Sequence, residues 1–230
     1  MQSHNNNELQ ELYKNRFSDK ENQKRKVIWQ KICNYLADNF FSKNISSSSI
    51  VVDVAAGYCD FINNIFVGKE IHKYAVDINP DVKKYAADDV VVYNDDVQNI
   101  EKHFKQGSVS LFFQSNFFEH LTKEQIKTLL EKEYRLLQEG GMICILTPNI
   151  RYCGGKYWDF WDHITPLTEK SLIEITETIG FKIAKCLPKF LPFTTKSRLP
   201  QNGWIVWLYL KLMPLSGWLF GEQSLILLSK

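Results

Sequence analysis

An apolar strand that contains an acid and runs into a turn with one glycine constrains this chain more than any other feature. The strand is Ile50–Val54, it includes Asp53, and the turn after it contains Gly57. The run is short, β-branched and not alternating, which is typical of a strand buried on both faces of a parallel sheet. Glycine allows a ligand to approach the main chain, and the helix expected next favours anionic groups at its start. The turn is therefore a candidate binding site.

A second acid, Asp77, follows the next apolar run, residues 71–76. It lies about 20 residues beyond the turn, where an acid can accept hydrogen bonds from both hydroxyls of a ribose. Together, Gly57 and Asp77 indicate a site for a nucleoside-bearing cofactor. A tight turn followed by a surface aspartate is the structural alternative.

Apolar runs and helical segments alternate through most of the chain, which predicts an α/β fold with a doubly wound parallel sheet. With 230 residues, 44% of them hydrophobic, the chain can bury one substantial core. We expect a helical lead-in over residues 1–45 and a single domain over residues 46–230. The expected strands are residues 50–54, 71–76, 90–93, 109–114, 142–146, 181–186 and 223–228.

The clearest expected helix lies between the fourth and fifth of these strands. It begins at a capping box, in which Thr122 and Gln125 satisfy free amides, and it closes at Gly140 and Gly141. The remaining expected elements are helices over residues 8–16, 20–40, 168–178 and 204–220 and a loop that contains Pro188, Pro192 and Pro200.

Net charge and cysteine content argue against several classes of protein. A formal charge of +2 gives no global attraction to nucleic acid, although one stretch without acids, between Glu177 and Glu222, is basic. The five cysteines are scattered and include no C-x-x-C pair, so we expect neither a disulfide framework nor a metal site. With no export signal expected in residues 1–11, this cysteine usage indicates a reducing cytoplasm. The basic residues of the acid-free stretch are Lys182, Lys185, Lys189, Lys196, Arg198 and Lys211.

The most apolar segment, residues 204–220, does not span a membrane by our interpretation. Lys211 and Pro214 interrupt it, and it is shorter than the ~20 residues that a span needs. Two alternatives stay open: a helix that docks on the core, and a helix that also touches a membrane surface through its tryptophans and basic neighbours.

Several motifs in this order resemble the class I S-adenosylmethionine-dependent methyltransferases. They are the first turn, Asp77, the pair Asp95–Asp96, the LFFQSNFFEHL run over residues 111–121 and the LQEGGMICILTPN run over residues 137–149. The resemblance implies a Rossmann-like seven-stranded sheet whose last strand is antiparallel. It also implies S-adenosyl-L-methionine as cofactor and S-adenosyl-L-homocysteine as product.

The resemblance assigns roles to residues of the expected cofactor site. Asp53 helps hold the turn and the methionine amine, Gly57 gives close backbone approach, and Asp77 binds the ribose. Asp96 lies at the adenine edge, and Asn116 faces the methyl donor.

This sequence departs from the family pattern at two turn positions. Ala55 and Cys59 replace the usual first and third glycines. Both residues can keep φ below zero, so we expect the turn to form with only Gly57 in a glycine-favouring conformation. A dinucleotide-binding oxidoreductase fits less well, because its motif needs glycine at Ala55 and Asp60.

The segment after the fifth strand is the expected acceptor lid, residues 149–166. It is rich in tryptophan and tyrosine together with aspartate and histidine, a mixture typical of a pocket for a polar ring. An aromatic cover packed on the sheet is the structural alternative. The candidate substrate-binding residues are Arg151, Tyr152, Trp158 and Trp161.

His163 is the preferred general base, with Asp162 or Asp159 orienting its ring. His120 is a further catalytic candidate, and Arg16 with Phe17 a weaker one for a lid. A base is needed only if the acceptor must lose a proton, because in-line transfer from an activated donor depends mainly on positioning.

The tail from Asn149 onward resembles methyltransferases that accompany bacterial surface-polysaccharide assembly. This resemblance implies a glycan-type or small-molecule acceptor and peripheral contact with the inner face of a membrane. A non-catalytic module that keeps the fold for partner or membrane contact is the alternative from another class. A nucleic-acid methyltransferase ranks third, because residues 115–118 contain no N-P-P-Y-type motif.

Overall fold

The computed structural model describes residues 19–192 and 202–230, and a single seven-stranded sheet organises them. The four strands β3, β2, β1 and β4 run parallel, β5 continues them, and β7 is antiparallel to both of its neighbours. This Rossmann-like α/β topology confirms the predicted fold class. In spatial order the strands are β3 (Val90–Tyr93), β2 (His72–Val76), β1 (Ile50–Val54), β4 (Val109–Ser115), β5 (Leu137–Pro148), β7 (Gln223–Ser229) and β6 (Lys182–Leu191).

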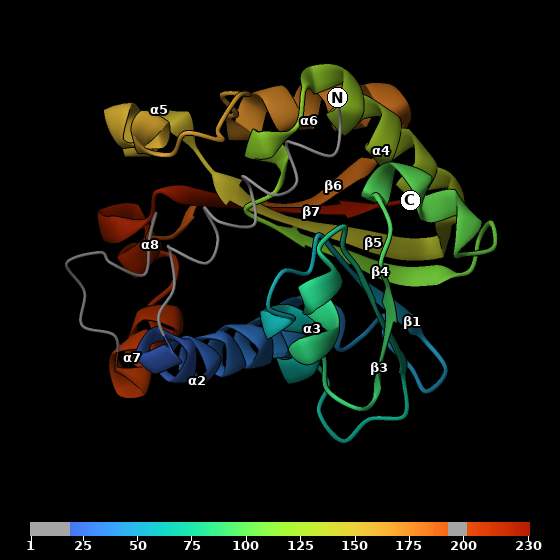
Figure 1. The fold of residues 1–230 in the computed structure, drawn as a ribbon. Coiled ribbons are helices and arrows are strands. Elements are labelled where there is room, and N and C mark those ends of the chain that lie inside the picture. The colour runs from blue at the N-terminus through green and yellow to red at the C-terminus, as the bar shows by residue number, and fades with distance from the viewer. Residues whose placement is uncertain (1–18, 193–201) are drawn as a thin grey trace.

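Helices cover both faces of the sheet, so the fold has three layers (Figure 1). On one face lie α2 (Asp19–Leu36), with the π-helical turn η1 (Ala37–Phe41) at its end, α3 (Asp60–Asn64) and α7 (Gly203–Lys211). On the other face lie α4 (Lys123–Leu136) and α6 (Glu169–Ile179). Each face of the sheet therefore has its own hydrophobic core, as the unalternating apolar strands predicted.

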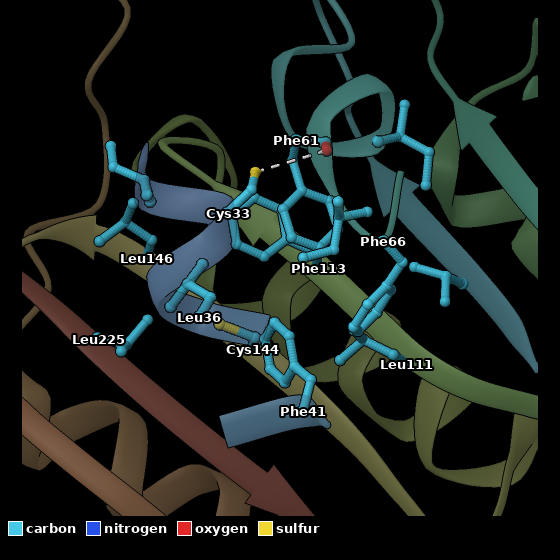
Figure 2. Close-up of a cluster of buried hydrophobic side chains, with 14 of the residues drawn as sticks. Cys33, Leu36, Phe41, Phe61, Phe66, Leu111, Phe113, Cys144, Leu146 and Leu225 are labelled. Carbon is cyan, nitrogen blue, oxygen red and sulfur yellow. Dashed lines mark hydrogen bonds between the residues drawn. The ribbon is translucent and has the colours of Figure 1, made fainter. Parts of the chain in front are cut away.

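The core under α2 holds the start of α3 in place (Figure 2). Phe61 of α3 stacks on Phe113 of β4 with ring centroids 3.7 Å apart and an interplanar angle of 9°. From α2, the thiol of Cys33 donates a hydrogen bond to the carbonyl oxygen of Phe61 at 3.6 Å. Because Phe61 follows the turn after β1 by only a few residues, this packing positions the candidate binding turn.

Two crossovers lack the α-helices that the alternating pattern predicted. The connection from β2 to β3 carries the short 3-10 helix η2 (Pro80–Lys84), and the one from β3 to β4 carries η3 (Val97–Lys102). Both are capped locally, by the side chains of Asn79 and Asp96.

Two predictions about α4 have different outcomes. The capping box at its start is confirmed, since Thr122 and Gln125 exchange side-chain and backbone hydrogen bonds. The prediction that the helix closes at Gly140 and Gly141 was wrong, because α4 ends at Leu136 and β5 begins at once. Leu137 pairs with Val109 of β4, so pairing in the sheet overrides the local glycine signal.

The C-terminal third also differs from the prediction in detail. Strand β6 continues to Leu191 and contains Pro188, which was expected in a loop. The register shifts there, and β6 is an edge strand, where a missing backbone donor is tolerated. The expected apolar helix is two helices, α7 and α8 (Leu215–Phe220), which meet at Pro214.

Several predictions lie outside the described residues. They concern the helix over residues 8–16, the lid residues Arg16 and Phe17, and Lys196, Arg198 and Pro200 of the C-terminal stretch. Within the described part of the chain, no helix is long and apolar enough to cross a membrane.

Candidate functional site

Three alternate residues of the turn after β1 adopt left-handed backbone conformations. Their φ angles are +56° at Ala55, +53° at Gly57 and +58° at Cys59. The expectation that only Gly57 needs positive φ was therefore wrong. A left-handed conformation costs an L-residue roughly 1–2 kcal/mol, so Ala55 and Cys59 hold strained backbone that the surrounding packing must offset.

Asp77, at the end of β2, closes this turn. Its Oδ2 accepts a hydrogen bond from the backbone N–H of Gly57 at 2.7 Å, and its Oδ1 accepts one from Asn79 at 2.7 Å. Burial raises the pKa of the Asp77 carboxyl, while these two amides act in the opposite direction. Since an ionised carboxylate offers about four lone-pair sites, two of them stay available to hydroxyl groups of a ligand.

Asp53 connects the strand before the turn to the helix after it. It is buried within β1, and its Oδ2 accepts a hydrogen bond from the backbone N–H of Ile62 in α3 at 3.3 Å. Burial raises the pKa of the Asp53 carboxyl well above its usual range. Asp53 thereby connects the end of the strand to the first turn of the helix.

The space above Gly57 is open. A Cβ atom added to Gly57 would meet no protein atom within 4 Å beyond its chain neighbours, so protein side chains do not fill the place where a ligand would approach. Two other predicted cofactor residues stand at the same edge of the sheet. Asn116 follows β4, is exposed and has a φ of +49°, and Asp96 follows β3 and caps η3 through the N–H of Gln98.

These observations test whether a nucleoside cofactor fits the residues present. An open approach to main chain, a buried carboxylate with spare acceptor sites and a polar edge are what a ribose and an adenine need. The donor set therefore fits the group.

A second cluster forms where the carboxyl ends of β4 and β5 meet. His120 lies in the short helix η4 (Phe118–His120), and its Nδ1 donates a hydrogen bond to the carbonyl oxygen of Asp162 at 3.0 Å. The Oδ2 atom of Asp162 is 3.4 Å from the same nitrogen. Asp162, which was predicted to orient His163, contacts His120 through both its carbonyl and its carboxylate oxygens.

The ring of His163 is buried in an aromatic cluster. It stacks on Phe160 with centroids 5.0 Å apart and meets Tyr157 and His120 edge to face at 4.8 Å and 5.0 Å. His120 and His163 are 43 positions apart in the chain, and the structure brings them together. Burial raises the pKa of the Tyr157 hydroxyl, which donates a hydrogen bond to the carbonyl oxygen of Thr165.

Sequence reasoning missed Glu119, which completes this cluster. Its side chain is 1% exposed, and its Oε2 accepts a hydrogen bond from the hydroxyl of Thr147 at 3.1 Å. Its carbonyl oxygen also accepts from the N–H groups of Ile164 and Thr165, which joins the lid to η4. A carboxylate directly before a histidine, a few residues after a strand, was the available signal.

The predicted substrate-binding residues lie at the surface beside this cluster. Trp158 and Trp161, in and just after η5 (Gly154–Asp159), are 52% and 89% exposed. Arg151 in α5 (Ile150–Cys153) has its Nη1 2.8 Å from Oε1 of buried Glu169. The Arg151 charge is therefore partly engaged within the fold.

Comparison with known proteins identifies the domain that contains this site. Residues 52–145 match the family model described as a methyltransferase domain, a range that runs from β1 to β5. The chain therefore contains a methyltransferase domain, and its fold is that of the class I S-adenosylmethionine-dependent methyltransferases. By this domain it is a methyltransferase. No curated protein sequence matches the chain.

Solved structures of the same fold have low sequence identity to the chain. An S-adenosylmethionine-dependent methyltransferase from Archaeoglobus fulgidus has a TM-score of 0.64 at 19% identity, covering 87% of this chain and 94% of its own. A methyltransferase from Haloferax volcanii, in complex with a methyltransferase activator, has a TM-score of 0.62 at 16% identity, with 87% and 89% covered. A geranyl diphosphate methyltransferase in complex with S-adenosylmethionine has a TM-score of 0.61 at 12% identity, with 87% and 84% covered.

Proposed function

We propose that the protein transfers a methyl group from S-adenosyl-L-methionine to a small-molecule or glycan-type acceptor. One observation carries this proposal: Asp77 and the amide of Gly57 close a left-handed turn beside open space, inside a methyltransferase domain. When bound, the cofactor supplies a methyl group already activated by a sulfonium. The protein then has to bind the cofactor and the acceptor, orient them and exclude water. It does not have to generate a leaving group.

The cofactor-binding residues in this proposal lie at the carboxyl ends of β1 to β4. Asp77 accepts hydrogen bonds from the ribose hydroxyls, and the main chain from Ala55 to Gly57 lies against the ligand. Asp53 keeps the turn attached to α3 through Ile62. Asp96 and Asn116 contribute at the adenine and methyl-donor ends, since each follows a strand that neighbours this turn.

The acceptor-binding residues in this proposal come from the segment after β5. Trp158 and Trp161 present large apolar rings to solvent, which suits stacking against a sugar or another polar ring. Arg151 and Tyr152 of α5 precede them in the same segment. Where the acceptor has to lose a proton, the proposed groups are His163 and the pair His120–Asp162.

The proposed setting is the inner face of a membrane, where a lipid- or nucleotide-linked glycan acceptor would be found. The support is an exposed apolar surface on α7 and α8, here called the α7–α8 patch. Exposed Lys211 stands within it, and the neighbouring chain contains no acid between Glu177 and Glu222. Apolar rings and cations together favour an anionic lipid surface. The patch consists of Trp204, Trp207, Leu212, Leu215, Trp218, Leu219 and Phe220.

The cofactor part of this proposal is tested by calorimetric titration with S-adenosyl-L-homocysteine, the product of the reaction. We expect saturable binding by the wild-type protein. Absence of binding would leave only the alternative of a non-catalytic module with this fold.

The acceptor part is tested with S-adenosyl-L-methionine carrying a labelled methyl group. The protein is offered nucleotide sugars, lipid-linked oligosaccharides, and DNA or RNA as a comparison. Label in the glycan fraction supports the proposal. Label only in nucleic acid would overturn it, and binding to nucleic acid would then fall steeply with added salt.

A further inference from the structure

Three potential metal ligands converge beside the proposed acceptor site. One atom each from Glu119, His120 and His163 can be chosen so that all three lie within 4.8 Å of one another. Glu119 and His163 are buried, and His120 is 17% exposed. The three residues come from two segments, η4 and the lid. Backbone hydrogen bonds from the N–H groups of Ile164 and Thr165 to the carbonyl oxygen of Glu119 join these segments.

The hydrogen bonds of His120 place its proton on Nδ1 and leave Nε2 able to coordinate a metal ion. A carbonyl oxygen only accepts hydrogen bonds, so the contact of Nδ1 with the Asp162 carbonyl at 3.0 Å places a proton on Nδ1. In the neutral ring, Nε2 then carries the lone pair, and it faces Oε1 of Glu119 at 4.0 Å. A histidine held through one nitrogen by backbone or carboxylate, with the other nitrogen free to coordinate, is the usual arrangement at metal sites.

Glu119 likewise has one side-chain oxygen that is hydrogen-bonded and one that can coordinate a metal ion. Thr147 donates to Oε2, which leaves Oε1 directed toward His120. An imidazole lone pair and a carboxylate oxygen that face each other repel unless a proton or a metal ion lies between them. The buried carboxylate would thus gain the compensating positive charge that burial requires.

We propose that Glu119, His120 and His163 bind a divalent transition-metal ion. Two imidazole nitrogens with one carboxylate oxygen suit borderline ions such as Zn²⁺ or Co²⁺ better than Mg²⁺, which prefers oxygen ligands. Three protein ligands leave a coordination position for water or for an acceptor oxygen. The inference relies on the proposed function only for the coordination of an acceptor oxygen, because metal binding itself needs neither cofactor nor acceptor.

The test uses Co²⁺ as a spectroscopic probe and Zn²⁺ as a competitor on the full-length protein. We expect one Co²⁺ per chain with visible d–d absorption that stoichiometric Zn²⁺ abolishes. Substitutions Glu119→Gln and His163→Asn should each weaken Co²⁺ affinity at least about 100-fold, since each removes a ligand. Circular dichroism and thermal unfolding of each variant establish that it is folded.

The matched control is His103→Asn. His103 also pairs with a carboxylate, Asp95 at 2.9 Å, but it lies at the end of η3 outside the cluster. Its variant should keep wild-type Co²⁺ affinity. Absence of Co²⁺ absorption in the wild-type protein, or equal loss in His103→Asn and His163→Asn, would overturn the proposal. Titration with S-adenosyl-L-homocysteine on the same samples reports separately on the proposed function.

Discussion

The backbone N–H of Gly57 donates a hydrogen bond of 2.7 Å to Oδ2 of Asp77. The two residues follow the neighbouring strands β1 and β2, whose register pairs Val54 with Val76. One carboxylate therefore sets the shape of the turn and, in the proposed function, also binds the ribose. Structure and binding depend on the same side chain, so a test of one has to monitor the other.

Substituting Asp77 with Asn should weaken binding of S-adenosyl-L-homocysteine at least tenfold, roughly the effect of one charge-assisted hydrogen bond of 1.5–3 kcal/mol. Calorimetry measures the affinity, and thermal unfolding shows whether the turn survives. Asp88→Asn is the control, because Asp88 is an exposed acid shortly before β3. Equal affinities of the wild type and Asp77→Asn for S-adenosyl-L-homocysteine would contradict the proposed contact between Asp77 and the ribose.

Replacing Ala55 with glycine should raise the free energy of unfolding by about 0.5–1 kcal/mol, because it relieves a left-handed alanine at φ +56°. The neighbouring Ala56→Gly is the matched control, since Ala56 is not among the residues with positive φ. It should lower the free energy of unfolding by about 0.5–1 kcal/mol through the greater entropy of the unfolded chain. Urea unfolding at one pH measures both, and a shift of the same sign in both variants would contradict the assigned strain.

Glu133 should make the protein less stable as pH rises through neutrality. Its side chain is fully buried in α4 and accepts a hydrogen bond from Gln114, and burial raises the pKa of its carboxyl from 4.5 to about 8. Between these two pKa values the unfolded chain is ionised and the folded chain is protonated, so unfolding releases a proton. The free energy of unfolding should therefore fall by on the order of 1 kcal/mol per pH unit from about pH 5 to about pH 8.

The comparison of Glu133→Gln with Glu131→Gln isolates this contribution. Glu131 lies on the same helix, is 41% exposed and pairs with Lys127. Urea unfolding across pH 5 to 8 should show a shallower pH dependence for Glu133→Gln and an unchanged one for Glu131→Gln. If the Glu133→Gln variant keeps the wild-type slope, the buried carboxyl is ionised in the folded protein.

The α7–α8 patch should bind vesicles of phosphatidylcholine with phosphatidylglycerol more tightly than vesicles of phosphatidylcholine alone. A double substitution, Trp204→Ser with Trp218→Ser, removes two rings that are 64% and 67% exposed, and should weaken vesicle binding at least tenfold. Trp161→Ser is the matched control, because Trp161 is 89% exposed but lies near η5. Sedimentation with vesicles measures binding, and an equal loss in Trp161→Ser would argue against the patch.

Local sequence predicted much of the fold correctly. The bounds of β1 and β3 and the capping box at Thr122 were predicted correctly, because each depends on residues adjacent in the chain. The strand at Gly140 was missed because its conformation depends on pairing with β4. Motif order likewise selected Gly57 and Asp77 as candidate cofactor residues, whereas the positive φ angles of Ala55 and Cys59 were not predicted.

A strand, a turn or a helix cap is specified by side chains a few positions apart, so the order of elements and the candidate cofactor turn could be inferred from the chain alone. The partners of a buried polar side chain come from segments far apart in sequence. Glu119 meets His163, and Arg151 meets Glu169, only after the sheet and the lid have assembled. Burial makes such contacts necessary, since a charge removed from water must find compensation, but the residue that provides it depends on the packing of the whole fold.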